Sequence, residues 1–143
     1  MIGERVNRYF ISILYPLYMP TPKTSKLPIY KKIGLTRKNY YSYDIVKPEE
    51  RDFIKRFIRK GEEIKWIERN RKVNPNEVGY LPTNDFVWKG KEWELKSKTQ
   101  GKIKERTIIR RINESVDKGK RNIFLDLGNR KASSKLIERL EKI

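Results

Sequence analysis

An amphipathic helix followed at once by a short apolar strand is the feature that most restricts the folds open to this chain. In residues 107–118 the apolar side chains recur at helical spacing, and Gly119 follows as a stop. Residues 122–127, NIFLDL, form a nearly continuous apolar run, which is typical of a buried central strand. A further strand, expected to begin near residue 92, precedes the helix. This order implies a right-handed crossover between parallel neighbours in one sheet.

The elements around this unit extend it to a mixed sheet. A helix is predicted from Pro48 to Gly61, because proline suits the first helical position and glycine ends a helix. Residues 62–69 alternate like a strand, and Ser134 is predicted to cap a last helix. The predicted order is helix, strand, two-stranded hairpin, helix, strand, helix. We expect an α/β domain whose mixed sheet is flanked by helices.

The first 46 residues are interpreted as a basic, tyrosine-rich extension, and residues 47–143 as the domain itself. The apolar run of residues 9–19 is too short to cross a bilayer and is interrupted by Pro16. It resembles a signal peptide faintly, but no small-residue cleavage site follows, so we expect a strand or short helix packed on the domain. Three closely spaced aromatic residues either stack on unpaired bases or pack against the domain: Tyr40, Tyr41 and Tyr43.

The charge of the chain favours a polyanionic partner. Lysine and arginine number 35 against 18 acidic residues, a net charge of +17. Such a field concentrates nucleic acid at the surface and releases counterions from each phosphate that it neutralises. An acidic protein partner or an anionic lipid surface are the alternatives.

The absence of cysteine and histidine restricts the chemistry further. It excludes disulfides, zinc–thiolate sites, cysteine nucleophiles and the histidines on which many ribonucleases rely. A metal bound by this chain would have to be a hard, oxygen-liking ion, so we expect Mg²⁺, with Mn²⁺ as the alternative.

A tight hairpin is predicted where aromatic and β-branched residues flank Lys89 and Gly90. With these as the loop, Asp85 faces Glu94, and Lys96 lies on the same side of the sheet. Facing carboxylates lie about 5 Å apart at Cβ and repel one another, which a bound divalent cation offsets. A one-residue slip would move Asp85 to the other face.

A metal, an activated water and a lysine on one face are the parts needed to attack a phosphodiester. The alternative is that Glu94 and Lys96 belong to a solvated charged strand face, the commoner fate of a Glu-x-Lys tripeptide.

The order of elements, with Asp85 and Glu94-Leu95-Lys96, resembles the PD-(D/E)xK nuclease superfamily. Three segments resemble more closely the C-terminal tRNase toxin domains of CdiA proteins from contact-dependent growth inhibition: NDFVWKGKEWELKSKT, TIIRRINES and NIFLDL. The resemblance covers about residues 48–130. One departure is that Asn84 precedes Asp85, and the nearest proline is Pro82.

The resemblance implies that Asp85 and Glu94 bind the metal. Lys96 would orient the attacking water or stabilise the pentacovalent phosphate. Many superfamily members add an acid from the first helix, and Glu50 is in line with the apolar stripe of that helix; it could equally be a dipole partner of the first turn. Five basic residues on or after the second helix are candidates for phosphate contacts, or form a solvated face: Arg110, Arg111, Lys118, Lys120 and Arg121.

These features predict a metal-dependent endonuclease that hydrolyses phosphodiester bonds, with RNA, and tRNA in particular, as substrate. Three alternatives remain: a DNA endonuclease with the same site, a non-catalytic basic RNA-binding module, and a metal-free ribonuclease that uses Lys, Arg and Tyr. The toxin resemblance also implies action in the cytoplasm, delivery as part of a larger effector, and an immunity protein, which we expect to be acidic.

Overall fold

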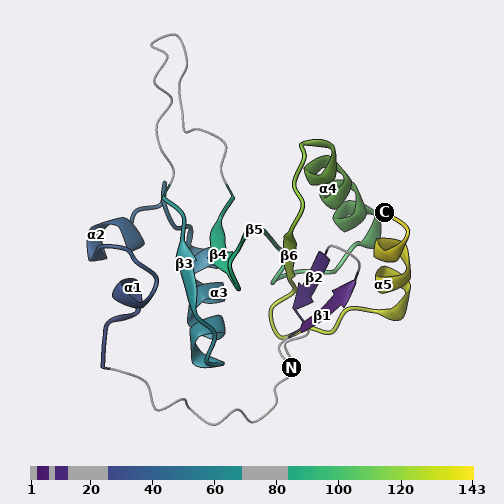
Figure 1. The fold of residues 1–143 in the computed structure, drawn as a ribbon. Coiled ribbons are helices and arrows are strands. Elements are labelled where there is room, and N and C mark those ends of the chain that lie inside the picture. Colours follow the sequence, from purple (N-terminus) through teal and green to yellow (C-terminus); the bar gives the residue numbers. More distant parts are fainter. Residues whose placement is uncertain (1–2, 7–8, 13–25, 69–83) are drawn as a thin grey trace. The chain divides into compact units, whose positions relative to one another are not determined.

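The computed structural model describes residues 3–6, 9–12, 26–68 and 84–143 (Figure 1), with the backbone alone for the first two of these segments. The contacts group the chain into two compact units. Unit 1 joins Met1–Pro20 to Trp93–Ile143, and unit 2 is Thr21–Glu92. The boundary predicted at residue 46 therefore falls inside unit 2, and the first residues of the chain group with the last ones.

Unit 1 is built on a four-stranded mixed sheet in the order β1-β2-β6-β5. Strands β1 and β2 are antiparallel, whereas β2 and β5 both run parallel to β6. The strands are β1 (Gly3–Val6), β2 (Tyr9–Ser12), β5 (Lys91–Ser97) and β6 (Ile123–Asp126). The parallel pairing of β5 with β6, and the central position of the NIFLDL strand, are thus as predicted. The prediction of a strand in residues 9–19 is confirmed over Tyr9–Ser12.

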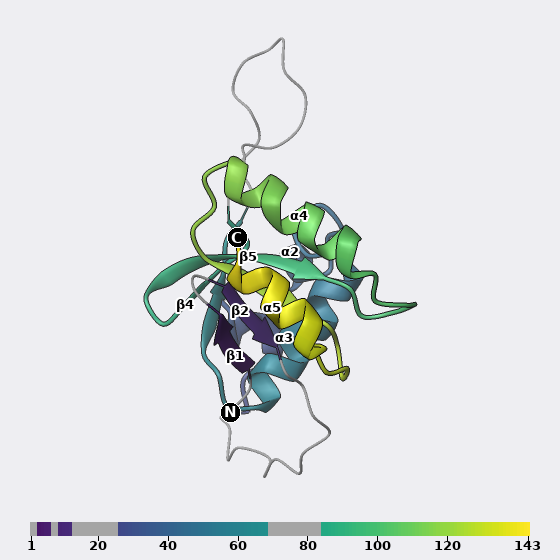
Figure 2. The same ribbon diagram turned by 90° about the vertical axis from the view of Figure 1, so that its right-hand side faces the viewer.

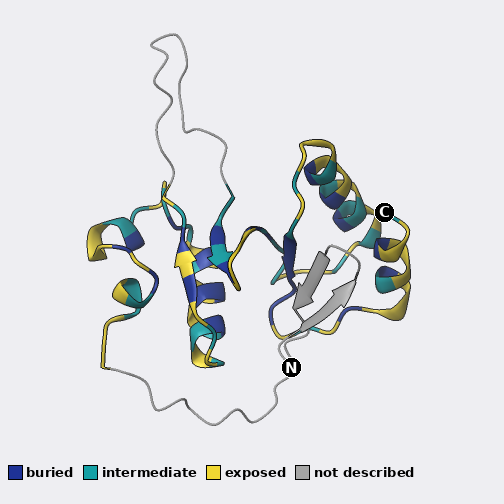
Figure 3. Ribbon diagram, viewed as in Figure 1, coloured by how far each residue is buried: buried dark blue, intermediate teal, exposed yellow. Residues whose placement is uncertain are grey.

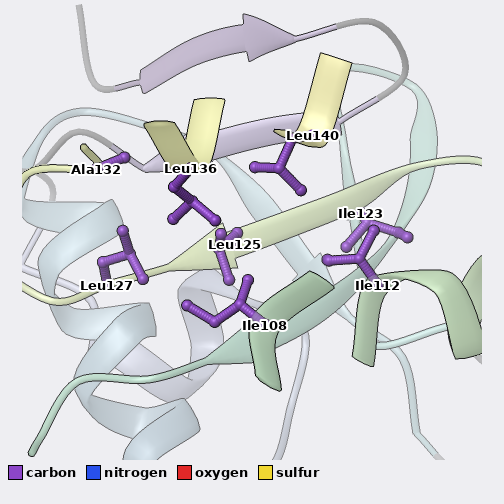
Figure 4. Close-up of a cluster of buried hydrophobic side chains, with 8 residues drawn as sticks. All are labelled: Ile108, Ile112, Ile123, Leu125, Leu127, Ala132, Leu136 and Leu140. Atoms are coloured by element: carbon purple, nitrogen blue, oxygen red, sulfur yellow. The ribbon is translucent and has the colours of Figure 1, made fainter. Parts of the chain in front are cut away.

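Two helices cover one face of this sheet: α4 (Glu105–Asp117) and α5 (Ser134–Glu141), which also contact one another (Figure 2). They enclose a cluster of buried side chains (Figure 4), namely Ile108, Ile112, Ile123, Leu125, Leu127, Ala132, Leu136 and Leu140. Every residue of β6 is buried, as Figure 3 shows. The apolar run of β6 therefore forms the centre of the core of unit 1.

The start of α5 differs from the prediction by one residue. The N-cap is Ser133, whose hydroxyl accepts a hydrogen bond from the backbone N–H of Leu136 at 3.1 Å. Ser134 is already helical. The prediction was wrong because both adjacent serines have a suitable hydroxyl, and only the extended backbone of Ser133 shows which one caps the helix.

The described residues of unit 2 form three helices and two antiparallel strands. These elements are α1 (Ile29–Lys32), α2 (Arg37–Tyr40), α3 (Pro48–Arg59), β3 (Ile64–Trp66) and β4 (Phe86–Trp88). Helix α3 begins at the predicted proline, and Gly61 follows its cap with a left-handed φ of 87°. Its apolar stripe packs on the strands through aromatic rings: Phe53 lies 5.4 Å from Phe86, and Phe57 lies 5.1 Å from Trp88, between ring centroids.

A two-residue turn at Lys89 and Gly90 follows β4, as predicted. Both residues have positive φ, 52° and 74°, which is the conformation of a type I′ turn. Glycine takes this conformation without strain. Lys89 is the sole non-glycine residue with positive φ in the described part of the chain, and its ammonium lies 4.5 Å from the centre of the Trp88 ring.

The fold class is therefore mixed α/β, and the order α3-β3-β4-β5-α4-β6-α5 along the chain is the predicted one. Among the residues that the structure describes, no helix is long and apolar enough to span a membrane.

Candidate functional site

A carboxylate held between two lysines is the most distinctive polar cluster of unit 1. The Lys96 ammonium lies 3.4 Å from Oε1 of Glu94, and the Lys120 ammonium lies 3.5 Å from Oε2 of the same residue. The three side chains are mostly buried, with exposed fractions of 23% for Lys96, 19% for Lys120 and 18% for Glu94. We call these three residues the Glu94 cluster.

The parallel strand pairing explains how the cluster forms. Glu94 lies opposite Ile123 and Lys96 opposite Leu125, so both charged side chains lie on the face of the sheet that α4 and α5 cover. Lys120 lies in the short connection from α4 to β6, where its N–H donates to the Ser115 carbonyl at 3.0 Å. Pairing β6 with β5 therefore brings Lys120, three residues before β6, close to Glu94 in the middle of β5.

One of the two carboxylate oxygens of Glu94 lacks a hydrogen bond in the part of the chain that the structure describes. Oε2 of Glu94 is buried and accepts no hydrogen bond from the described residues, although the Lys120 ammonium lies 3.5 Å away. A buried carboxylate is costly unless opposite charge and hydrogen bonds compensate it. The two ammonium groups supply the charge, and together with Glu94 they give the cluster a net charge of +1. The buried oxygen still has capacity for a further ligand.

The other predicted phosphate contacts of α4 divide into two groups. The Arg111 guanidinium donates to the Ser97 carbonyl at 3.4 Å and so ties α4 to the end of β5. Arg110 is exposed and lies 3.9 Å from Glu114 one turn away, and Lys118 and Arg121 are exposed. Three of the five candidates are therefore open to a polyanion, whereas Arg111 and Lys120 contact groups within unit 1.

Asp85 and Glu50 both belong to unit 2. Asp85 is half-buried in a bend before β4, and its carbonyl accepts a hydrogen bond from the Ile67 N–H at 2.9 Å. Glu50 is buried, as the stripe of α3 predicted, and its Oε1 accepts from the Lys47 N–H at 2.8 Å. Glu50 therefore caps the first turn of α3. Asp85 and Glu94 belong to different units, so their predicted proximity stays a prediction. A catalytic role for Glu50 also stays a prediction.

Asp126 has an interior role in the turn after β6. Its side chain is fully buried, and Oδ1 accepts from the Gly128 N–H at 2.9 Å. This contact indicates an interior carboxylate whose charge is compensated by a hydrogen bond within the turn.

The cluster offers one ligand to a divalent cation. Glu94 supplies a hard oxygen ligand with a buried, unbonded atom, which suits Mg²⁺ or Mn²⁺. Its charged neighbours are ammonium groups, which repel a cation, and no group of three acidic side chains gathers around a metal position in the described ranges. Unit 1 thus supplies a single carboxylate ligand for a metal, and the sequence predicts Asp85 of unit 2 as the second ligand.

Arg130 is a structural residue that sequence reasoning missed. Its guanidinium donates to the backbone carbonyls of Lys98, Gly101 and Leu127. It thereby binds the loop that follows β5 to the turn that follows β6. No local pattern predicts the contacts with Lys98 and Gly101, because these residues lie about 30 residues away along the chain.

Replacing Arg130 with alanine should lower the free energy of unfolding by about 2 kcal/mol, because hydrogen bonds to a charged donor contribute more than neutral ones. Urea denaturation measures the loss, and faster hydrogen exchange should be confined to residues 98–101 and 127–130. The exposed Lys131→Ala variant is the matched control. Unchanged exchange in these two segments for Arg130→Ala would show that the clamp is not needed to hold them.

Comparisons with family models, with curated proteins and with solved structures return no match to this chain.

Proposed function

We propose that this protein is a metal-dependent endonuclease that hydrolyses phosphodiester bonds in RNA. The observation that carries the proposal is the Glu94 cluster: a carboxylate with an unbonded buried oxygen, flanked by two lysines, in a chain of net charge +17. Positive charge at this position stabilises the negative charge that develops on the phosphate during attack.

Each residue of the cluster has a distinct role in this proposal. Lys96 contacts a non-bridging oxygen of the scissile phosphate and orients the attacking water. Lys120 adds a second positive charge beside it, and Glu94 holds both ammonium groups in place. Glu94 and Asp85 would be the metal ligands, and a bound Mg²⁺ or Mn²⁺ supplies an activated water and further positive charge.

The substrate is RNA, with tRNA favoured, in this proposal. The basic, exposed residues Arg110, Lys118 and Arg121 suit contacts with a phosphate backbone. The resemblance of residues 93–127 to tRNase toxin domains supports tRNA as the substrate and an acidic immunity protein as a partner. It likewise supports action in the cytoplasm after delivery with a larger effector.

One observation favours a second candidate function. Because two lysines already neutralise Glu94, the cluster also suits a purely structural ion network in a non-catalytic RNA-binding module. A DNA endonuclease would use the same catalytic groups, since only contacts with the 2′-hydroxyl distinguish the two substrates.

Incubation with total tRNA, ribosomal RNA and plasmid DNA, each with Mg²⁺ and with EDTA, tests the proposal. We expect cleavage of tRNA that requires Mg²⁺ and is lost in Asp85→Asn. Cleavage in EDTA would favour a metal-free ribonuclease, and cleavage of plasmid DNA alone would favour the DNA endonuclease. Binding of RNA without cleavage in any condition would overturn the nuclease assignment and support the RNA-binding module.

A further inference from the structure

The large exposed apolar and aromatic side chains of the described residues gather in one short stretch of unit 2. They are Leu27, Tyr41 and Tyr43, with exposed fractions of 51%, 59% and 65%. Tyr40, next to them in sequence, is fully buried. The three tyrosines therefore divide into one that anchors the stretch in the core and two whose rings face solvent.

Backbone hydrogen bonds hold the chain on both sides of Tyr43. The Tyr41 N–H donates to the Arg37 carbonyl at 3.3 Å and closes α2, and the Ser42 N–H donates to the Asn39 carbonyl at 3.1 Å. Beyond Tyr43, the Val46 N–H donates to the Ser42 carbonyl at 2.9 Å. Tyr41 and Tyr43 thus project from a folded turn, which lowers the entropy lost when a ligand orders them.

The Tyr41 ring is also held by its neighbours. It meets the Tyr40 ring edge to face, with centroids 5.0 Å apart, and the Arg51 guanidinium lies 5.6 Å from its centre. Arg51 is itself fixed, because Nη1 donates to the Val46 carbonyl at 2.9 Å. Burial raises the pKa of the Tyr40 hydroxyl, so this anchoring ring stays uncharged at neutral pH. More than half of the Tyr41 surface remains exposed despite these contacts.

The charged residues near Tyr41 and Tyr43 in the sequence favour a negatively charged partner. Residues 26–51 contain seven lysines and arginines against three acidic residues, and one of the three, Glu50, is buried as a helix cap. Arg37 and Lys38, on α2 just before the tyrosines, are exposed. Exposed aromatic rings and exposed cations are the two components of surfaces that bind single-stranded nucleic acid, because bases stack on the rings while cations contact phosphates.

We propose that Tyr41 and Tyr43, with Arg37 and Lys38, form a stacking surface for unpaired bases of single-stranded RNA. This surface lies entirely within unit 2 and requires neither the Glu94 cluster nor catalysis. It goes beyond the proposed function, because it assigns the chain a binding site for unpaired bases that is separate from the cleavage chemistry.

The test uses the full chain with Glu94→Gln, which should slow any cleavage by about 10²-fold or more, and two fluorescein-labelled 12-nucleotide probes. One is oligouridine RNA, and the other is an abasic strand of the same length and charge. We expect fluorescence anisotropy to show at least about tenfold tighter binding of oligouridine, since the stacking of a single base already contributes about that factor. The Tyr41→Leu, Tyr43→Leu variant should lose this preference without changing the salt dependence of binding, which reports phosphate contacts.

Two controls separate stacking from other effects. Leu27→Ser removes exposed apolar area but no ring, so the preference for oligouridine should persist. Tyr41→Phe, Tyr43→Phe keeps both rings and should recover the preference that the leucine variant loses, with circular dichroism melting as the check on folding. Equal affinity for the two probes, or a full preference in the folded leucine variant, would overturn the proposal. So would loss of the preference on Leu27→Ser, which would indicate a general apolar surface for a protein partner.

Discussion

Replacing Glu94 with glutamine should lower the rate of RNA cleavage by roughly 10²- to 10³-fold, the range measured for loss of one preorganised electrostatic group. The amide keeps the shape of the side chain but loses the charge that holds Lys96 at 3.4 Å and Lys120 at 3.5 Å. It also replaces the buried, unbonded oxygen that would bind a metal. Single-turnover cleavage of tRNA in Mg²⁺, beside binding of the same tRNA, measures the effect.

The matched control for this prediction is Glu114→Gln. Glu114 is a glutamate of α4 that also forms an ion pair with a basic residue, Arg110, but its side chain is 61% exposed. Exposed pairs contribute little, so this variant should cleave and fold like the unmodified protein. A well-folded Glu94→Gln variant that cleaves at the normal rate would show that the cluster is structural. An equal loss in both variants would indicate a general electrostatic effect instead.

Replacing Leu136 with alanine should lower the free energy of unfolding by about 2–5 kcal/mol, the range for large-to-small changes in a packed core. Leu136 is fully buried in α5 and lies in the cluster with Ile108, Ile112 and Leu125 (Figure 4). Alanine removes apolar surface from this contact and leaves a cavity between helix and sheet. Because small domains have a stability of only about 5–15 kcal/mol, the loss is a large part of the total.

Urea denaturation followed by circular dichroism measures this loss, and hydrogen exchange shows where it acts. Amides of β6 and α5 should exchange faster in Leu136→Ala, because both elements share its cluster. Glu138→Ala, an exposed change in the same helix, should leave both measurements nearly unchanged. A midpoint for Leu136→Ala that equals that of Glu138→Ala would show that α5 does not pack on the sheet as described.

Local pattern in the sequence was enough to predict most of the elements. Pro48 and Gly61 bound α3, Gly119 follows α4, and the apolar run of residues 122–127 contains the buried strand β6. The tight turn at Lys89 and Gly90 was predicted too, because aromatic and β-branched residues flank this pair. The N-cap of α5 was predicted at Ser134 instead of Ser133, because the two neighbours have the same capping group.

The partners of the charged residues could not be predicted in the same way. Lys120 was expected to contact phosphate, but its ammonium lies beside Glu94 because β6 pairs with β5. Glu50 lay on the predicted face of α3, yet only the structure shows its hydrogen bond to Lys47. Likewise, nothing in a row of tyrosines distinguishes the buried Tyr40 from the exposed Tyr41 and Tyr43.

The sequence by itself determined the α/β class, the order of the elements, the parallel strand–helix–strand unit and the basic character of the chain. Each of these follows from the periodicity of apolar residues, from residues that begin or end an element, or from a sum of charges. The first two depend on residues that are close together in the sequence, and the third depends on composition alone. The tertiary structure alone decided that β2 lies beside β6, that Lys120 contacts Glu94 and that Arg130 binds the carbonyls of Lys98 and Gly101. These contacts join residues far apart in the chain, and strand register and loop path, which no local pattern encodes, bring them together.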